Sequence, residues 1–113
     1  DVIQFVLRES RRGRKYDIII MDPPVYGRGP KGELWQIETS LTKLMKECVK
    51  LLSDEPILFL INCYTASFSH ISLKNILETN IKNKGFFESG EIGIPIENSK
   101  LILPCGIYAR FFT

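Results

Sequence analysis

Residues 16–24 read Tyr16-Asp17-Ile18-Ile19-Ile20-Met21-Asp22-Pro23-Pro24, and this stretch decides the fold. Its short, continuous apolar run with β-branched side chains is typical of a strand covered on both faces in a parallel sheet. The strand is expected to end at Asp22, because the prolines that follow lack the N–H group that a central ladder needs. The run from Ile57 to Ile61, which follows Pro56, predicts a second buried strand of the same kind.

Apolar residues at helical spacing predict three helices around these two strands. The first runs from Val2 towards Gly13, a residue typical of the position just past a helix end. The second is expected behind a Thr39 or Ser40 cap, and the third closes before Gly85. Residues 86–94 and 101–112 are rich in aromatic and β-branched residues and predict a hairpin. This order of elements predicts an α/β sheet with helices on both faces and an antiparallel strand pair at one edge.

Length and composition limit the classes of protein that need to be considered. The 113 residues allow one domain, and 44% hydrophobic with 25% charged residues is typical of a soluble globular protein. No apolar run approaches the roughly 18 residues that span a bilayer, so we expect no membrane insertion. The three cysteines are widely spaced, which favours a reducing, cytoplasmic setting and offers no close pair for a metal such as zinc. The chain opens on Asp1 without an initiator methionine, which indicates a processed chain or a fragment.

Basic residues gather in two places although the net charge is only +2. Five cations lie between Arg8 and Lys15, where they could contact RNA phosphates or interact with the dipole at the end of the first helix. Arg28 and Lys31 follow the two prolines. They could bind phosphate or a large polar partner, or they could be ordinary solvated loop charges.

Asp22, Pro23 and Pro24 predict a rigid polar rim at the carboxyl end of the first strand, where open α/β sheets bind their ligands. Proline fixes φ and removes donors, the carboxylate accepts hydrogen bonds, and Tyr26 follows within stacking reach. Such a rim suits a flat ring that bears an amino group. The alternative is structural, with the prolines ending the strand and Asp22 capping the turn.

Residues 27–32, Gly27-Arg28-Gly29-Pro30-Lys31-Gly32, match the G-x-G-x-x-G fingerprint of dinucleotide-dependent oxidoreductases. We reject this interpretation, because the fingerprint belongs in a tight strand-to-helix turn and here two prolines separate it from its strand. The acid expected at the end of the next strand is also absent, since that strand leads into Asn62.

Residues 16–32 resemble the fourth motif of class I S-adenosylmethionine (SAM)-dependent methyltransferases, in the branch related to ribosomal RNA methyltransferases. Residues 60–66 and 103–110 are similar to the fifth-strand and last-strand segments of the same branch. The resemblance implies a Rossmann-like sheet of which this chain holds the fourth to the seventh strand. Residues 1–113 would then be a single partial domain, the C-terminal portion of a catalytic domain. Its partner would be the N-terminal half that carries the glycine-rich cofactor loop, so we expect the isolated chain to be inactive.

The resemblance also implies a cofactor and the residues that contact it. SAM would be the methyl donor, and Asp1 matches the acid that faces its adenine amino group. Asp22, Pro23 and Pro24 match the motif that lines the methyl-transfer site, so Asp22 is expected to contact both cofactor and substrate.

The resemblance implies that the substrate is a base in RNA, and the branch of the family implies ribosomal RNA. Tyr26, Arg28 and Lys31 are the expected substrate contacts. Tyr26 lies one residue further along than the tyrosine of amino-group methylators, because Val25 intervenes.

The sequence leaves two alternatives for the methylated atom. Methylation of cytosine C5 needs a thiolate nucleophile, and Cys63 stands near the end of the second strand, although a buried thiol can also be a small hydrophobe. Methylation of an amine or ring nitrogen needs only orientation and hydrogen-bond acceptors, which Asp22 could supply, and we favour this reaction. The alternative to catalysis is a methyltransferase-derived binding module that pairs through an exposed sheet edge with a partner or a second copy.

Overall fold

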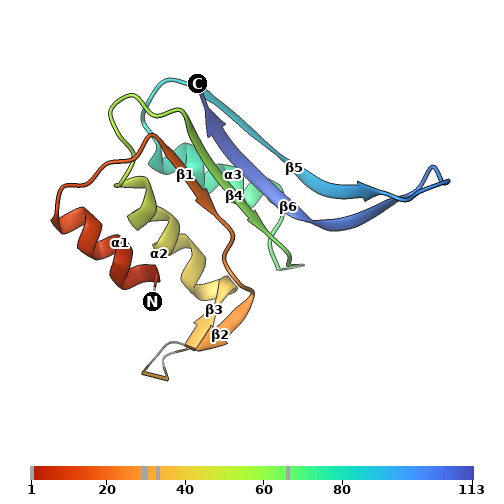
Figure 1. Cartoon of the computed structure of the whole chain (residues 1–113), viewed down its shortest axis with the longest axis horizontal. Coiled ribbons are helices and arrows are strands. Elements are labelled where there is room, and N and C mark those ends of the chain that lie inside the picture. Colours follow the sequence, from red (N-terminus) through yellow and green to blue (C-terminus); the bar gives the residue numbers. More distant parts are fainter. Residues whose placement is uncertain (1, 29–30, 33, 66) are drawn as a thin grey trace.

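In the part of the chain that the structure describes, three helices and a four-stranded sheet make up the body, and a short hairpin extends from it (Figure 1). The computed structural model describes residues 2–28, 31–32, 34–65 and 67–113. The helices are α1 (Val2–Arg11), α2 (Ile37–Val49) and α3 (His70–Asn80). The main sheet contains β1 (Ile18–Met21), β4 (Leu58–Cys63), β5 (Phe86–Pro95) and β6 (Ile102–Phe112), and the small hairpin contains β2 (Tyr26–Arg28) and β3 (Leu34–Gln36).

The main sheet has the strand order β1-β4-β6-β5. β1 runs parallel to β4, with Ile18 opposite Leu58 and Met21 opposite Ile61, and β6 is antiparallel to both β4 and β5. This arrangement confirms the predicted pair of parallel strands with an antiparallel pair at one edge. Among the described strands β1 pairs only with β4, so it forms the other edge of the sheet.

The core lies between one face of the sheet and the helix layer, in which α1 packs on α2 and α2 on α3. Along β4 the burial alternates, with Phe59, Ile61 and Cys63 buried beneath the helices. On the other face Ile18 and Ile20 are 51% and 64% exposed. The prediction of helices on both faces is therefore wrong for the described part of the chain, because an apolar run cannot tell which face a helix covers.

We call the uncovered side of the sheet the open face. Partners in a strand ladder share a face, so the register places its side chains in three cross-strand rows. The first two rows contain Ile18, Leu58, Phe112 and Phe86, and then Ile20, Leu60, Arg110 and Glu88. The third row continues with Asp22, Asn62 and Tyr108, so the open face changes from apolar to polar towards the carboxyl end of β1.

Two local features differ from the sequence-based expectations. Residues 25–33 are rich in Gly, Pro and Lys, a composition that predicts a loop, but the chain pairs Tyr26 with Gln36 and Arg28 with Leu34 as the β2–β3 hairpin. The second helix begins directly from β3 at Ile37 rather than behind Thr39 or Ser40, and its N-cap, Gln36, makes no side-chain capping bond. The helix therefore begins where the second strand of the hairpin ends.

A buried acid fixes α1 to the rest of the core. Glu9 is 6% exposed and accepts a hydrogen bond from the Tyr16 hydroxyl, which keeps the pKa of Tyr16 above its usual value. The backbone of Tyr16 is bonded in turn to Leu51 and Ser53 beyond α2. Through its side chain and its backbone, Tyr16 therefore connects the end of α1, the segment that enters β1 and the segment after α2.

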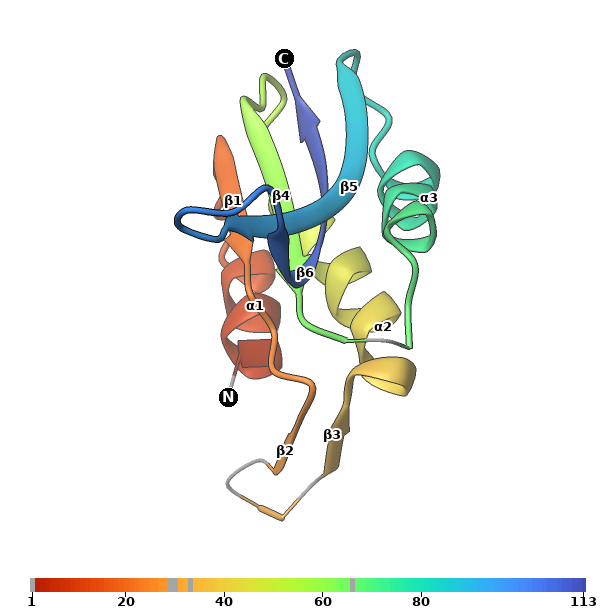
Figure 2. The ribbon, with the colours of Figure 1, turned by 90° about the vertical axis from the view of Figure 1, so that its right-hand side faces the viewer.

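The β5–β6 hairpin is long, and its tip projects away from the helices (Figures 1 and 2). Where β6 passes beyond the end of β4, Gly106 has a φ of +133°, and a Cβ there would lie 2.7 Å from the carbonyl oxygen of Cys63. A glycine is required where β6 passes this closely over the end of β4. Within the described residues no helix is long and apolar enough to cross a membrane.

Candidate functional site

Two polar side chains meet where the parallel strands end. Met21 pairs with Ile61, so the next residue along each strand, Asp22 after β1 and Asn62 in β4, come side by side. The Asn62 Nδ2 atom donates a hydrogen bond of 3.0 Å to the Asp22 Oδ1 atom. Asp22 is exposed and Asn62 half-buried, so the carboxylate is held on the open face and reachable from solvent.

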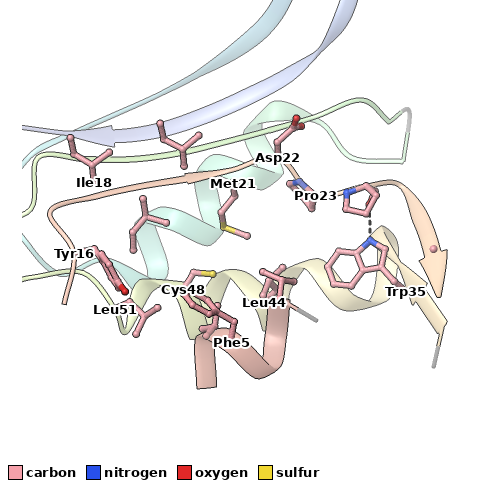
Figure 3. A pocket seen from close by; sticks show the side chains of 16 residues that line it. Phe5, Tyr16, Ile18, Met21, Asp22, Pro23, Trp35, Leu44, Cys48 and Leu51 are labelled. Atoms are coloured by element: carbon pink, nitrogen blue, oxygen red, sulfur yellow. Dashed lines mark hydrogen bonds between the residues drawn. The ribbon is translucent and has the colours of Figure 1, made fainter. Parts of the chain in front are cut away.

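The two prolines after Asp22 are fixed to the hairpin and to the start of α2. Trp35 donates its indole N–H to the carbonyl oxygen of Pro24 over 2.6 Å (Figure 3), and the Ile37 amide donates to the carbonyl of Val25 over 3.1 Å. Trp35 thus anchors the segment that follows the two prolines. These bonds and the restricted φ of proline make the segment behind Asp22 stiff.

An apolar groove of about 720 Å³ runs between α1, β1 and α2. Its walls are largely hydrophobic, with Phe5, Leu44 and Cys48 on the helices (Figure 3). Met21 points towards the helices, whereas Asp22 at the end of the same strand points the opposite way (Figure 3). Asp22, Pro23 and Pro24 also line the groove, so the polar site borders one end of it.

Cys63 lies close to Asp22 but in a poor environment for a nucleophile. The thiol is 2% exposed, on the helix-covered side of β4. Burial, followed by the negative charge of Asp22, raises the pKa of Cys63 above its usual value. Cys48 is also buried in the core, where burial and then the charge of Glu47 raise its pKa to about 11. At Cys63, burial and the nearby negative charge both disfavour the thiolate that attack on a base requires.

The other predicted substrate and cofactor contacts lie on the β2–β3 hairpin or outside the described residues. The β2–β3 hairpin extends from the carboxyl end of β1, the same end as Asp22 (Figure 2). It carries the backbones of Tyr26 and Arg28, whose side chains are outside the described set, and Lys31 is exposed in its turn. Asp1 lies outside the described residues.

The basic cluster from Arg8 to Lys15 is not part of this site. It spans the end of α1 and the start of the segment that enters β1, so the whole strand separates it from Asp22. Several of its members have local partners, such as Lys15, whose ammonium group donates to the Lys50 carbonyl over 2.6 Å. His70, the first residue of α3, bonds Ser89 over 2.8 Å.

A polar cluster on the open face was missed by the sequence reasoning. Glu88 accepts from the Tyr108 hydroxyl over 2.6 Å and from two Arg110 nitrogens over 3.1 and 3.2 Å. Those bonds, with Tyr108 contributing most, lower the pKa of Glu88, and the bond to Glu88 raises the pKa of Tyr108. Strand periodicity does place residues 108 and 110 on one face, but it does not say which strand of the sheet supplies their partner.

Among the described residues, no three His, Cys, Asp or Glu side chains lie close enough together to hold a metal ion. At the strand end, the exposed Asp22 carboxylate on its stiff, partly apolar rim can accept hydrogen bonds.

Comparison with known proteins gives a consistent class. The crystal structure of a SAM-dependent methyltransferase from Agrobacterium tumefaciens has a TM-score of 0.88 and 31% identity, over 99% of this chain and 38% of that one. Ribosomal RNA large subunit methyltransferase K of Neisseria meningitidis serogroup B is 35% identical over 63 residues, which are 55% of this chain and 18% of that protein. No protein-family model matches the chain.

A more distant structure shares the fold alone. SMU.776, described as a candidate methyltransferase and crystallised with SAH, has a TM-score of 0.70 and 21% identity over 98% of this chain and 30% of its own.

The strand order and these likenesses define a Rossmann-like α/β sheet of the class I SAM-dependent methyltransferases. The match to ribosomal RNA large subunit methyltransferase K relates the chain to ribosomal RNA methyltransferases, as residues 16–32 predicted. It spans less than two fifths of either of these two relatives.

Proposed function

We propose that this chain forms part of the catalytic site of a SAM-dependent methyltransferase that acts on an amine or ring nitrogen of a base in RNA. One observation carries the proposal: the exposed Asp22 carboxylate, bonded to Asn62, stands at the carboxyl end of β1 on a stiff Pro23-Pro24 rim. The A. tumefaciens relative, which is named for SAM-dependent methyl transfer, supports the reaction type.

The residues at this strand end fit both the cofactor and an amine substrate. SAM, when bound, supplies an electrophilic methyl group on a positively charged sulfonium, and Asp1 and Asp22 are its proposed contacts. A carboxylate favours nearby positive charge. Asp22 also accepts a hydrogen bond from the substrate nitrogen and stabilises the positive charge that develops there. Pro23 and Pro24 keep this acceptor in one position, which lowers the cost of orienting the base.

The environment of Cys63 supports nitrogen rather than carbon as the methylated atom. Attack on C5 of cytosine requires an accessible thiolate. The Cys63 thiol is buried on the helix side, and burial and the nearby charge of Asp22 raise its pKa, which disfavours the thiolate. Methylation of an amine or ring nitrogen requires no nucleophile from the protein.

Ribosomal RNA is the proposed substrate, because the N. meningitidis relative is named for it. Tyr26, Arg28 and Lys31, on the hairpin at the same end of β1 as Asp22, are its proposed contacts. The target base has to leave its stack to reach Asp22.

The test is methyl transfer from radiolabelled SAM to ribosomal RNA by the full-length protein, with Asp22→Asn compared with Asp17→Asn. The two aspartates flank the same strand at opposite ends, and Asp17 accepts a bond of 2.6 Å from Ser53. We expect Asp22→Asn to lower kcat roughly 100-fold or more, by analogy with removal of a group that stabilises transition-state charge. Asp17→Asn should stay close to the unsubstituted rate.

The product identifies the atom after nuclease digestion and mass spectrometry of the nucleosides. An N-methylated nucleoside is expected. Formation of 5-methylcytosine, with transfer lost in Cys63→Ala, would overturn the nitrogen assignment. An Asp22→Asn protein with full activity would overturn the proposed site. An intact protein that forms oligomers and methylates no RNA would favour the binding-module alternative.

A further inference from the structure

We propose that Asn62 is a positioning residue that holds the Asp22 carboxylate in its working orientation. The inference rests on the proposed function, since it assigns a second residue to the same site. The juxtaposition that carries it is the bond of 3.0 Å from Asn62 Nδ2 to Asp22 Oδ1 across the ends of β1 and β4.

The chemistry of the two groups determines the direction of this bond. An ionised carboxylate can only accept, so the amide donates through Nδ2 and its carbonyl oxygen is turned away from Asp22. One carboxylate oxygen of Asp22 is thereby engaged. Among the described side chains, which do not include those of Tyr26 and Arg28, no other one bonds this carboxylate. The second oxygen is therefore available to the substrate nitrogen.

The backbones of the two residues differ in rigidity. Asp22 lies just beyond β1, and its own strand has a neighbour on one side only among the described strands. Asn62 belongs to β4, a central strand that pairs with β1 on one side and with β6 on the other, where it stands opposite Tyr108. Asn62 thus provides a fixed platform for a side chain that lies outside the ladder.

An aspartate without that donor would rotate about its side-chain torsions, and only some orientations would face the substrate nitrogen. Misplacing a reacting contact by about 1 Å can cost roughly 100-fold in rate. Asn62 therefore acts through Asp22, and its loss should lower kcat more than it changes the KM for RNA.

The first test measures methyl transfer by the full-length protein for Asn62→Leu, Asp22→Ala and the double variant. Asn83→Leu is the matched control, because Asn83 also donates its amide, to the Asp54 carbonyl over 3.2 Å, but remote from Asp22. We expect Asn62→Leu to lower kcat about 10- to 100-fold. The double variant should be no slower than Asp22→Ala, since a residue that acts through Asp22 has nothing left to orient.

A second variant distinguishes a loss of positioning from a loss of folding. Asn62→Asp preserves size but places two carboxylates together, so it should be slow at neutral pH and recover as the pH falls. One proton shared between the carboxyl groups restores a donor to Asp22. Glu88, Tyr108 and Arg110 share this face but bond one another, and Cys63 lies on the other face. The ratio of variant to unsubstituted kcat between pH 8 and pH 5 isolates the effect.

The outcomes distinguish a failure of the positioning role from a failure of the proposed function. If Asp22→Ala is inactive but Asn62→Leu is as fast as Asn83→Leu, the positioning role is wrong and the proposed function stands. The positioning role is equally excluded by a flat pH ratio for Asn62→Asp, or by a double variant slower than Asp22→Ala. If Asp22→Ala retains full activity, the proposed function itself fails.

Discussion

The two faces of the β1–β4–β6–β5 sheet are built from alternate residues of the same strands but have different tasks. The helix-covered face contributes Phe59, Ile61 and Phe111, each fully buried, to the core. The open face has exposed apolar residues at one end and Asp22 and Asn62 at the other. Packing is thus concentrated on one face and polar chemistry on the other, which means that the two can be perturbed separately.

The largest expected difference between the faces is in the free energy of unfolding. Ile61→Ala removes a fully buried side chain, and such truncations cost about 2–5 kcal/mol. The same change at Ile20, which is 64% exposed on the neighbouring strand, should cost under about 1 kcal/mol. Urea unfolding of the two variants of this chain measures both. Equal losses would mean that the open face is covered in solution, for example by a second copy.

The second expected effect concerns the glycine that lets β6 cross the end of β4. Gly106→Ala would bring a Cβ to 2.7 Å from the Cys63 carbonyl oxygen at a φ of +133°, and such backbone strain costs about 1–3 kcal/mol or more. Gly27→Ala is the control, because a Cβ there meets no atom within 4 Å. Thermal unfolding of the two variants should differ by several degrees. A Gly106→Ala protein as stable as the control would show that the strands separate without cost.

A smaller loss is expected from the buried acid that anchors α1. Glu9→Ala leaves the Tyr16 hydroxyl without its acceptor, and an unsatisfied partner of this kind costs about 1–3 kcal/mol. Glu97→Ala, an exposed acid in the turn between β5 and β6, should be neutral. Hydrogen exchange adds a local measurement, since amides of α1 should lose protection in Glu9→Ala before those of β4. Uniform loss across the chain would argue against a local anchor.

The smallest expected effect is the pH dependence contributed by the open face. The Tyr108 and Arg110 bonds hold the pKa of Glu88 below its ordinary value of 4.5. A lowered pKa in the folded state stabilises the protein above pH 4.5, and this contribution is lost as the pH falls through the lowered value. Because Glu88 is solvated, we expect only a small change in the urea midpoint between pH 6 and pH 3. In Glu88→Gln that change should shrink, and an unchanged pH dependence would mean that other carboxyl groups carry it.

The sequence alone was sufficient for the strands of the main sheet and for the end of the first strand, but not for the β2–β3 hairpin. The apolar run before Asp22 and the run after Pro56 predicted two parallel strands, because short apolar runs bounded by proline favour strands over helices. The structure pairs these two strands side by side. The prolines determined where the first strand stops. The resemblance of residues 16–32 then identified the class of enzyme, which the relatives support.

Only the tertiary structure decided which residues act together and which face is covered. Asp22 and Asn62 are 40 residues apart, and the register of β1 and β4 brings them into contact. The same register turns Cys63 towards the helices, because side chains alternate along a strand and a shift of one residue would have reversed both outcomes. Local patterns determine whether a segment is a strand, but the pairing of distant strands determines what its side chains meet.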